Sequence, residues 1–152
     1  MVMARKYHQG FYRLHNPSKY VGNRDQVIFR SGWEYRAMKM FDENQDVLRW
    51  ASEEVVVPYI HPIDSKTHRY FVDFFAEVRQ ANGNIKTFLI EVKPKVQMSP
   101  PKPQKRQTKR YIEECVTYAV NICKWDAAIA YSKKRGWEFI FMTENELAVG
   151  GL

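Results

Sequence analysis

The stretch Thr87–Pro94, Thr-Phe-Leu-Ile-Glu-Val-Lys-Pro, decides how the rest of the chain is interpreted. Its apolar residues and its closing proline predict a β-strand. Because side chains alternate along a strand, Leu89, Glu91 and Lys93 share one face. This pairing of a carboxylate with an ammonium fits two interpretations. One is an ion pair at an exposed strand end, which is common and weak. The other is a metal-binding carboxylate beside a lysine that acts on water or phosphate.

Asp73 lies near the centre of the preceding apolar stretch, Arg69–Arg79, which we predict to be one long strand. In such a strand Asp73 shares its face with Phe71 and Phe75. The opposite face is expected to carry Val72, Phe74, Ala76 and Val78. A carboxylate between two phenylalanines costs free energy unless backbone N–H groups or a cation satisfy it. The residues leave both alternatives open.

The connection between these two strands decides whether their acids meet. A two-residue Asn-Gly turn would pair Asp73 with Val92 and place Glu91 on the wrong face. A three-residue loop, Ala81-Asn82-Gly83, with Gly83 in the left-handed conformation and a bulge, pairs Asp73 with Glu91. We favour this register. Directly opposed carboxylates repel each other, so the pair calls for a cation between them.

A helix is predicted to begin at Ser31 and to end at 44–46. Ser31 and Glu34 form a capping box, in which the hydroxyl accepts an N–H of the first turn and the Glu side chain reaches back. The apolar face of this helix is expected to carry Trp33, Ala37, Met40 and Phe41. The cap alone explains Glu34, so a role as metal ligand stands beside it as an alternative. Glu54 is a weaker candidate.

The remaining elements follow from local patterns. Strands are expected at 55–60 and 137–142, with a loop at 61–68. Helical periodicity begins near Thr108, is expected to break at 121–124 and to resume at 125–134, with Gly136 at the C-terminal cap. Thr143 and Glu146 form a second capping box. We predict a single domain over residues 25–152, preceded by a basic aromatic arm over residues 1–24.

The arm combines cations with aromatic rings. It contains Arg5, Lys6, Tyr7, Phe11, Tyr12, Arg13, Lys19, Tyr20 and Arg24. Such a segment can grip a phosphate backbone, dock on another protein, or wrap over its own core through the aromatic side chains. The pattern does not choose among these alternatives.

Composition limits the class of protein. The chain has 152 residues, 45% of them hydrophobic, and a net charge of +7, which suits one domain with a polyanionic partner. Cys115 and Cys123 lack metal-ligand spacing and are expected to be buried, reduced thiols. Because no apolar run has the length of a signal peptide or a membrane span, we expect a protein that works inside a cell or inside a particle assembled there.

The segment 94–110 contains four of the seven prolines and no acidic residue. Its basic residues are Lys95, Lys102, Lys105, Arg106, Lys109 and Arg110. Proline stiffens such a segment and charge extends it, so one interpretation is a solvated linker. We favour a loop that contacts DNA phosphates beside the carboxylates, because positive charge screens the approach of a polyanion to acidic residues.

The order of these elements resembles the restriction-endonuclease-like PD-(D/E)xK superfamily. The sequence segments around the candidate residues narrow the resemblance to the head-completion nucleases of T-even-like tailed phages. It is carried by Phe29-Arg30-Ser31-Gly32-Trp33-Glu34, Glu53-Glu54-Val55-Val56-Val57-Pro58-Tyr59, Tyr70-Phe71-Val72-Asp73-Phe74 and Ile90-Glu91-Val92-Lys93-Pro94-Lys95. TnsA-type and phage junction-resolving endonucleases share shorter pieces of it. One departure is Val72, where the superfamily's signature has a proline.

The resemblance implies a mixed α/β fold, with a central mixed sheet of about four strands flanked by helices. It implies a deoxyribonuclease that uses Mg²⁺, or Mn²⁺ in its place, held by Asp73 and Glu91 with the Val92 carbonyl as a third ligand. Lys93 would orient the attacking water or neutralise the phosphate, and Glu34 would hold a second metal or its water.

The implied partners are double-stranded DNA and phage head or neck proteins. The implied location is the host cytoplasm during assembly, or the virion. Two other functions fit the same residues: a structural docking protein that retains a nuclease fold, and a nuclease specific for junctions or transposon ends. Among other chemistries, we find no His–Cys set for zinc, no Gly-rich phosphate loop and no Ser/His/Asp arrangement.

Overall fold

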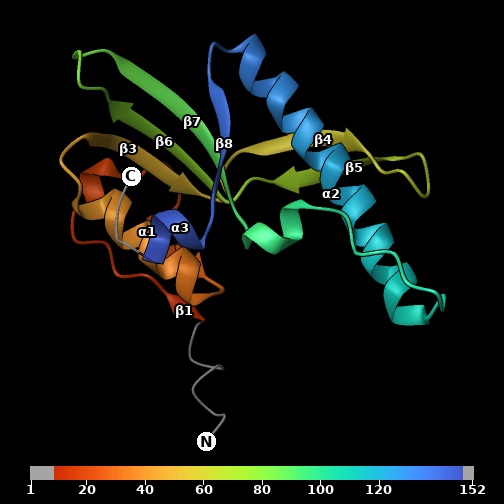
Figure 1. The fold of residues 1–152 in the computed structure, drawn as a ribbon. Coiled ribbons are helices and arrows are strands. Elements are labelled where there is room, and N and C mark those ends of the chain that lie inside the picture. Colours follow the sequence, from red (N-terminus) through yellow and green to blue (C-terminus); the bar gives the residue numbers. More distant parts are fainter. Residues whose placement is uncertain (1–8, 149–152) are drawn as a thin grey trace, which may run out of the picture.

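The computed structural model describes residues 9–148, which are organised around a four-stranded sheet of order β3-β6-β7-β8 (Figure 1). Its strands are β3 (Val47–Ser52), β6 (Phe74–Arg79), β7 (Ile85–Val92) and β8 (Glu138–Met142). The first three are antiparallel, whereas β8 runs parallel to β7. A parallel pair needs a crossover, and helix α2 (Lys109–Lys134) supplies it. The predicted mixed α/β class is confirmed.

Helices cover both faces of this sheet (Figure 1). Helix α1 (Gly32–Glu43), joined by the short α3 (Glu144–Ala148), covers one face, and α2 covers the other. Ile90 packs in the cluster of α1, with Phe41, whereas Leu89 packs with Trp125 of α2. Both faces of β7 are therefore buried, which confirms the predicted alternation and explains why this strand is almost continuously apolar.

The first strand of the central sheet was not predicted. It is β3, whereas the predicted strand at 55–60 belongs to a separate hairpin of β4 (Val56–Ile60) and β5 (Thr67–Phe71). A register shift between Val47 and Arg49 interrupts the pairing of β3 with β6. This irregularity hides the alternation that identifies a strand. The hairpin packs under α2, on the side of the sheet opposite α1 (Figure 1).

The single strand predicted at 69–79 is wrong, because the chain breaks at Val72 and Asp73. Before the break β5 pairs with β4, and after it β6 pairs with β3 and β7. The Val72 N–H donates to the Val55 carbonyl (3.0 Å) and the Glu53 N–H to the Asp73 carbonyl (3.1 Å), so both residues remain hydrogen-bonded. Val72 consequently packs against α2, not on the α1 face with Phe74.

Helix α2 is continuous over 26 residues, so the predicted break at 121–124 is wrong. Nothing in that stretch removes a backbone donor, and burial of Trp125 and Ala128 holds the helix on the sheet. Gly136 has φ +73° directly after the helix, as predicted for the C-terminal cap. The two cysteines are free but only half-buried.

The N-terminal part of the described chain wraps over the core. It contains β1 (Gly10–Phe11), which pairs with β2 (Ile28–Phe29), and two 3-10 turns, η2 (Pro17–Lys19) and η3 (Arg24–Gln26). Tyr12 and Tyr20 are buried against Trp50. Of the three alternatives for the arm, wrapping holds for these two rings. Arg5, Lys6 and Tyr7 lie outside the described residues.

Two short elements complete the structure. The 3-10 turn η4 (Lys95–Met98) follows β7. The capping box before α3 is confirmed, because the Thr143 N–H donates to Glu146 Oε1 (2.6 Å) and the Asn145 N–H to Thr143 Oγ1 (3.2 Å). No helix within residues 9–148 has the length and apolar character needed to cross a bilayer.

Candidate active site

The hairpin between β6 and β7 has the predicted register. Two hydrogen bonds close its loop: the Gln80 N–H donates to the Asn84 carbonyl (2.7 Å), and the Gly83 N–H donates to the Gln80 carbonyl (2.9 Å). Gly83 has φ +87°, as expected for the left-handed conformation. Phe74 pairs with Ile90, and no register shift occurs within the strands. Asp73 directly precedes the first paired residue of β6, and Glu91 directly follows its partner on β7, which agrees with the charge of Glu91 acting on Asp73.

Asp73 is held by the neighbouring strand. Its Oδ2 accepts the Val92 N–H at 2.9 Å. Because the N–H and C=O of one strand residue point to the same side, the Val92 carbonyl is also directed toward Asp73. A carboxylate and a backbone carbonyl therefore converge at this end of the sheet.

Glu91 is a buried acid, with only 6% of the residue exposed. The Tyr70 hydroxyl donates to its Oε1, and its Oε2 lies 3.2 Å from Lys93 Nζ. Lys93 is anchored to β8 through its N–H, which donates to the Met142 carbonyl at 3.0 Å. The ion pair considered from the sequence exists, but its burial distinguishes it from a weak surface pair.

Glu34 is both a cap residue and a neighbour of these acids. Its N–H donates to Ser31 Oγ (3.1 Å), as predicted, while its Oε1 accepts the N–H of Arg30 (2.8 Å) and not that of Ser31. Its Oε2 takes part in no hydrogen bond among residues 9–148. One oxygen therefore serves the helix end, and the other is available to a ligand.

The electrostatics of this cluster favour a bound cation. Burial, followed by the charge of Glu91, raises the pKa of Asp73 well above its usual range, while the Val92 N–H opposes this rise. Burial also raises the pKa of Glu34, and the charges of Glu53 and Glu91 add to it. The charge of Glu91 thus makes ionisation of Asp73 and of Glu34 harder. Oxygen ligands crowded in this way fit a hard divalent cation, which would relieve the repulsion.

The six basic residues predicted to contact DNA lie at different distances from the acids. Lys95 is close, because it follows Pro94 and its N–H donates to Glu144 Oε1 at 2.8 Å. The others follow the chain away from the sheet to the far end of α2 (Figure 1). All six are exposed. The segment therefore extends from the acids outward and does not surround them.

Two neighbours of the site, Tyr70 and Glu53, were not found by sequence reasoning. Tyr70 lies within the quoted motif around Asp73, but the predicted single strand hid the hairpin that brings it to Glu91. Glu53 forms an ion pair with Arg30 beside Glu34. Its φ of +55° marks a sharp turn that no local pattern indicated. Glu54, the weaker candidate, accepts the Asn23 N–H (3.1 Å) on the N-terminal segment instead.

Residues 44–144 match the family described as "TnsA-like endonuclease N terminal". The matched segment contains Asp73, Glu91 and Lys93 and begins after Glu34. The chain is also 37% identical over 140 residues to the head completion nuclease of Enterobacteria phage T4. That alignment covers 90% of this chain and 91% of its relative.

Proposed function

The chain belongs to the TnsA-like endonuclease family, and on that premise we propose that it is a metal-dependent deoxyribonuclease that hydrolyses phosphodiester bonds. The observation that supports this activity lies at one end of the central sheet, where Asp73 accepts the Val92 N–H beside the Glu91–Lys93 ion pair and feels the charges of both Glu91 and Glu34. These acids are drawn together by buried strands and a helix end, at a cost in repulsion that a surface ion pair would not require.

Magnesium fits the donor set, because it is bound by one or two carboxylates together with water and phosphate oxygens. Asp73 and Glu91 would hold it, with the Val92 carbonyl as a third protein ligand and Glu34 for a second ion or its water. When bound, such an ion acidifies water and stabilises the charge that develops on the phosphate. Manganese, which takes similar oxygen ligands, can substitute.

The protein's own groups position the reaction. Lys93 can donate hydrogen bonds from its ammonium, which would orient an attacking water or neutralise a phosphate oxygen, and its contact with Glu91 at 3.2 Å keeps it within the site. Tyr70 and the Val92 N–H each hold one carboxylate oxygen. They fix the acids in one orientation, which reduces the reorganisation needed when substrate binds.

The substrate class that fits the charge is double-stranded DNA. The net charge of +7 and the exposed cations of the 94–110 segment would neutralise phosphates and release counterions on binding. Lys95 would contact phosphates next to the acids, and Lys102, Lys105, Arg106, Lys109 and Arg110 would contact them farther along the duplex.

The biological role that we propose is head completion in a tailed phage, in which packaged DNA is processed so that heads can join tails. Its support is the name of the phage T4 relative and the alignment over nearly the full length of both chains. On this proposal the protein acts in the host cytoplasm during assembly, and it contacts head or neck proteins or remains in the virion.

A cleavage assay tests the activity. Closed circular and linear plasmid would be incubated with Mg²⁺, with Mn²⁺ or with EDTA, using wild type, Asp73→Asn and Lys93→Met. Glu77→Gln is the matched control, because it removes a β6 carboxylate that pairs with Arg49 outside the site. We expect cleavage only with metal, by wild type and control. Nicking of the closed circle would identify endonuclease action.

Equal cleavage by wild type and by both site variants would overturn the catalytic assignment. If no protein cuts DNA under any condition, a docking role on a nuclease fold becomes the better interpretation. Branched and transposon-end substrates in the same assay would identify a junction-specific or end-specific enzyme.

A further inference from the structure

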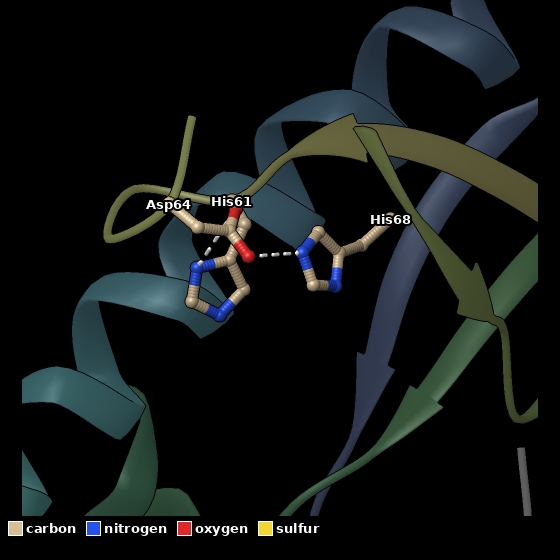
Figure 2. Close-up of side chains that lie close together, drawn as sticks. All are labelled: His61, Asp64 and His68. Atoms are coloured by element: carbon tan, nitrogen blue, oxygen red, sulfur yellow. Dashed lines mark hydrogen bonds and ion pairs between the residues drawn. The ribbon is translucent and has the colours of Figure 1, made fainter. Parts of the chain in front are cut away.

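A second group of metal-ligating side chains lies at the tip of the β4–β5 hairpin, apart from the carboxylates described above (Figures 1 and 2). It consists of His61, Asp64 and His68, which each offer one ligand atom within 4.8 Å of the others. Asp64 Oδ2 lies 2.8 Å from His68 Nε2, and Asp64 Oδ1 lies 3.9 Å from His61 Nδ1. The proposed nuclease activity makes no use of these residues.

The fold of the hairpin brings the three side chains together. His68 lies in β5 opposite Tyr59 of β4, and the connection between the strands turns back at once. The His61 N–H donates to the Lys66 carbonyl (2.9 Å), and the Ser65 N–H donates to the His61 carbonyl (2.9 Å). This closed turn explains why sequence analysis found no zinc set: the two histidines are separated along the chain, in a stretch predicted to be a loop.

The hydrogen bonds of the metal-free turn involve the same atoms that zinc would engage. His61 Nδ1 accepts the N–H of Ile63 at 3.2 Å, and this bond would give way to the metal, because the nitrogen has a single lone pair. The Lys66 N–H donates to Asp64 Oδ1 at 2.9 Å and holds the carboxylate at the turn. A neutral imidazole and a carboxylate are the forms that bind metals.

The donor types identify the class of ion. Two imidazoles with one carboxylate match the three-ligand sets in which zinc keeps an open fourth position. With zinc–ligand bonds near 2.0–2.1 Å, ligand atoms in a tetrahedral site lie roughly 3.4 Å apart. Two of the three observed separations, 2.8 and 3.9 Å, bracket that value and the third lies within 4.8 Å, so side-chain rotations would bring the ligand atoms to zinc. Magnesium, which prefers oxygen ligands alone, is a poor fit.

We propose that the tip of the β4–β5 hairpin binds one zinc ion through His61 Nδ1, an Asp64 oxygen and His68 Nε2, with water in the fourth position. The site is open to solvent, because the side chains of Asp64 and His68 are 40% and 39% exposed. In the absence of metal, Asp64 and His68 share a hydrogen bond instead (Figure 2). Zinc would replace this bond and lock the turn.

Zinc binding to the full chain tests the proposal. Protein freed of metal would be titrated with Zn²⁺ against a chromophoric chelator, with millimolar Mg²⁺ present to occupy the carboxylate site. We expect one zinc per chain in wild type and in Asp73→Asn. His61→Asn and His68→Asn should each weaken binding by at least about a hundredfold, because direct ligands matter more than outer-shell partners.

The matched control is His15→Asn, since His15 is another exposed histidine beside a carboxylate, 3.4 Å from Glu43. It should bind zinc like wild type. Zinc should also slow hydrogen exchange at the amides of Lys66 and His68, a readout that does not depend on DNA cleavage. Zinc uptake unchanged by His68→Asn, or no uptake at micromolar zinc, would overturn the proposal and leave the nuclease assignment untouched.

Discussion

Two regions of this protein withdraw carboxylates from solvent, and the regions differ in the number of hydrogen bonds that each carboxylate accepts. Asp42, at the end of α1, is fully buried and accepts three hydrogen bonds, from the Tyr12 hydroxyl (3.0 Å) and the N–H groups of His15 (2.7 Å) and Asn16 (3.0 Å). Glu34, Asp73 and Glu91 converge at the other region. Each of these accepts one hydrogen bond, and Glu91 adds an ion pair.

The difference separates a structural acid from the acids that we propose to be functional. Asp42 is satisfied by the N-terminal segment, so its burial ties that segment to the core and leaves little capacity for a ligand. Glu34 and Asp73 each keep one oxygen without a hydrogen bond among the described residues, and burial together with the charge of neighbouring acids raises the pKa of both. Carboxylates that are short of donors and feel one another's charge take up a proton or bind a cation, and such perturbed groups are typical of functional sites.

The strongest test of this difference is to neutralise one acid in each region. Asp73→Asn should lower DNA cleavage by about a thousandfold, because the loss of several kcal/mol of charge stabilisation falls on the reacting phosphate. The metal-free variant should melt no lower than wild type, since a repulsive charge is removed. Cleavage rates and thermal melts in EDTA measure the two effects. Wild-type activity in the variant would refute the comparison.

The corresponding change at the other region should affect folding alone. Asp42→Asn turns an acceptor oxygen into a donor that faces the three donors, and it should destabilise the protein by about 2–4 kcal/mol. Glu43→Gln is the control, because this exposed neighbour pairs only with His15 at the surface. Urea unfolding measures the loss. Cleavage per folded molecule should stay at the wild-type level, and a drop in it would contradict the structural role of Asp42.

The pH dependence of stability provides a third test. Because the folded pKa of Asp73 is raised, its protonated form stabilises the metal-free fold, and this contribution is lost as pH rises through the folded pKa. As pH rises above about 4, the usual pKa of an Asp side chain, metal-free wild type should therefore lose stability relative to Asp73→Asn. Added Mg²⁺ should stabilise wild type more at higher pH, since binding competes with protons. Melting curves with and without EDTA test both signs, and a pH-independent difference would argue against a buried, ionising acid.

The smallest effect concerns positioning. Tyr70→Phe removes the donor that orients Glu91, and it should lower kcat about tenfold with a smaller change in KM. The control Tyr59→Phe deletes a hydroxyl from the partner strand of the same hairpin. Raising the Mg²⁺ concentration should recover part of the Tyr70→Phe loss if Glu91 binds metal. An equal loss in both variants would point to packing instead.

The central hairpin could be predicted because local chemistry determines it. Of the two loops that Ala81, Asn82 and Gly83 allow, the favoured three-residue loop sets the register in which Arg79 pairs with Ile85 and Phe74 with Ile90. The cap at Ser31 and Glu34 is equally local. Each of these features depends on residues within a few positions of one another, so tertiary packing had little opportunity to override the pattern.

The remaining errors come from interactions between distant segments. The break at Val72 and Asp73 exists because β5 finds β4 as its partner, which the apolar pattern does not encode. The same rearrangement brings Tyr70 to Glu91 and sets His68 beside His61. Helix α2 continues where a break was expected because the sheet buries Trp125. In each case packing decided between conformations that the local sequence permits.

The length of α2 has a consequence for the DNA that the protein can hold. Lys124 Nζ lies over the ring of Tyr70, at 5.6 Å, so this part of the helix is close to the acids. Lys109, at the other end, is fifteen residues away along the chain, which corresponds to about 22 Å along a helix axis. In B-form DNA that span is roughly six to seven base pairs. On the proposed function, a duplex that follows the helix would need at least this length to reach both Lys124 and the basic residues at the tip of α2.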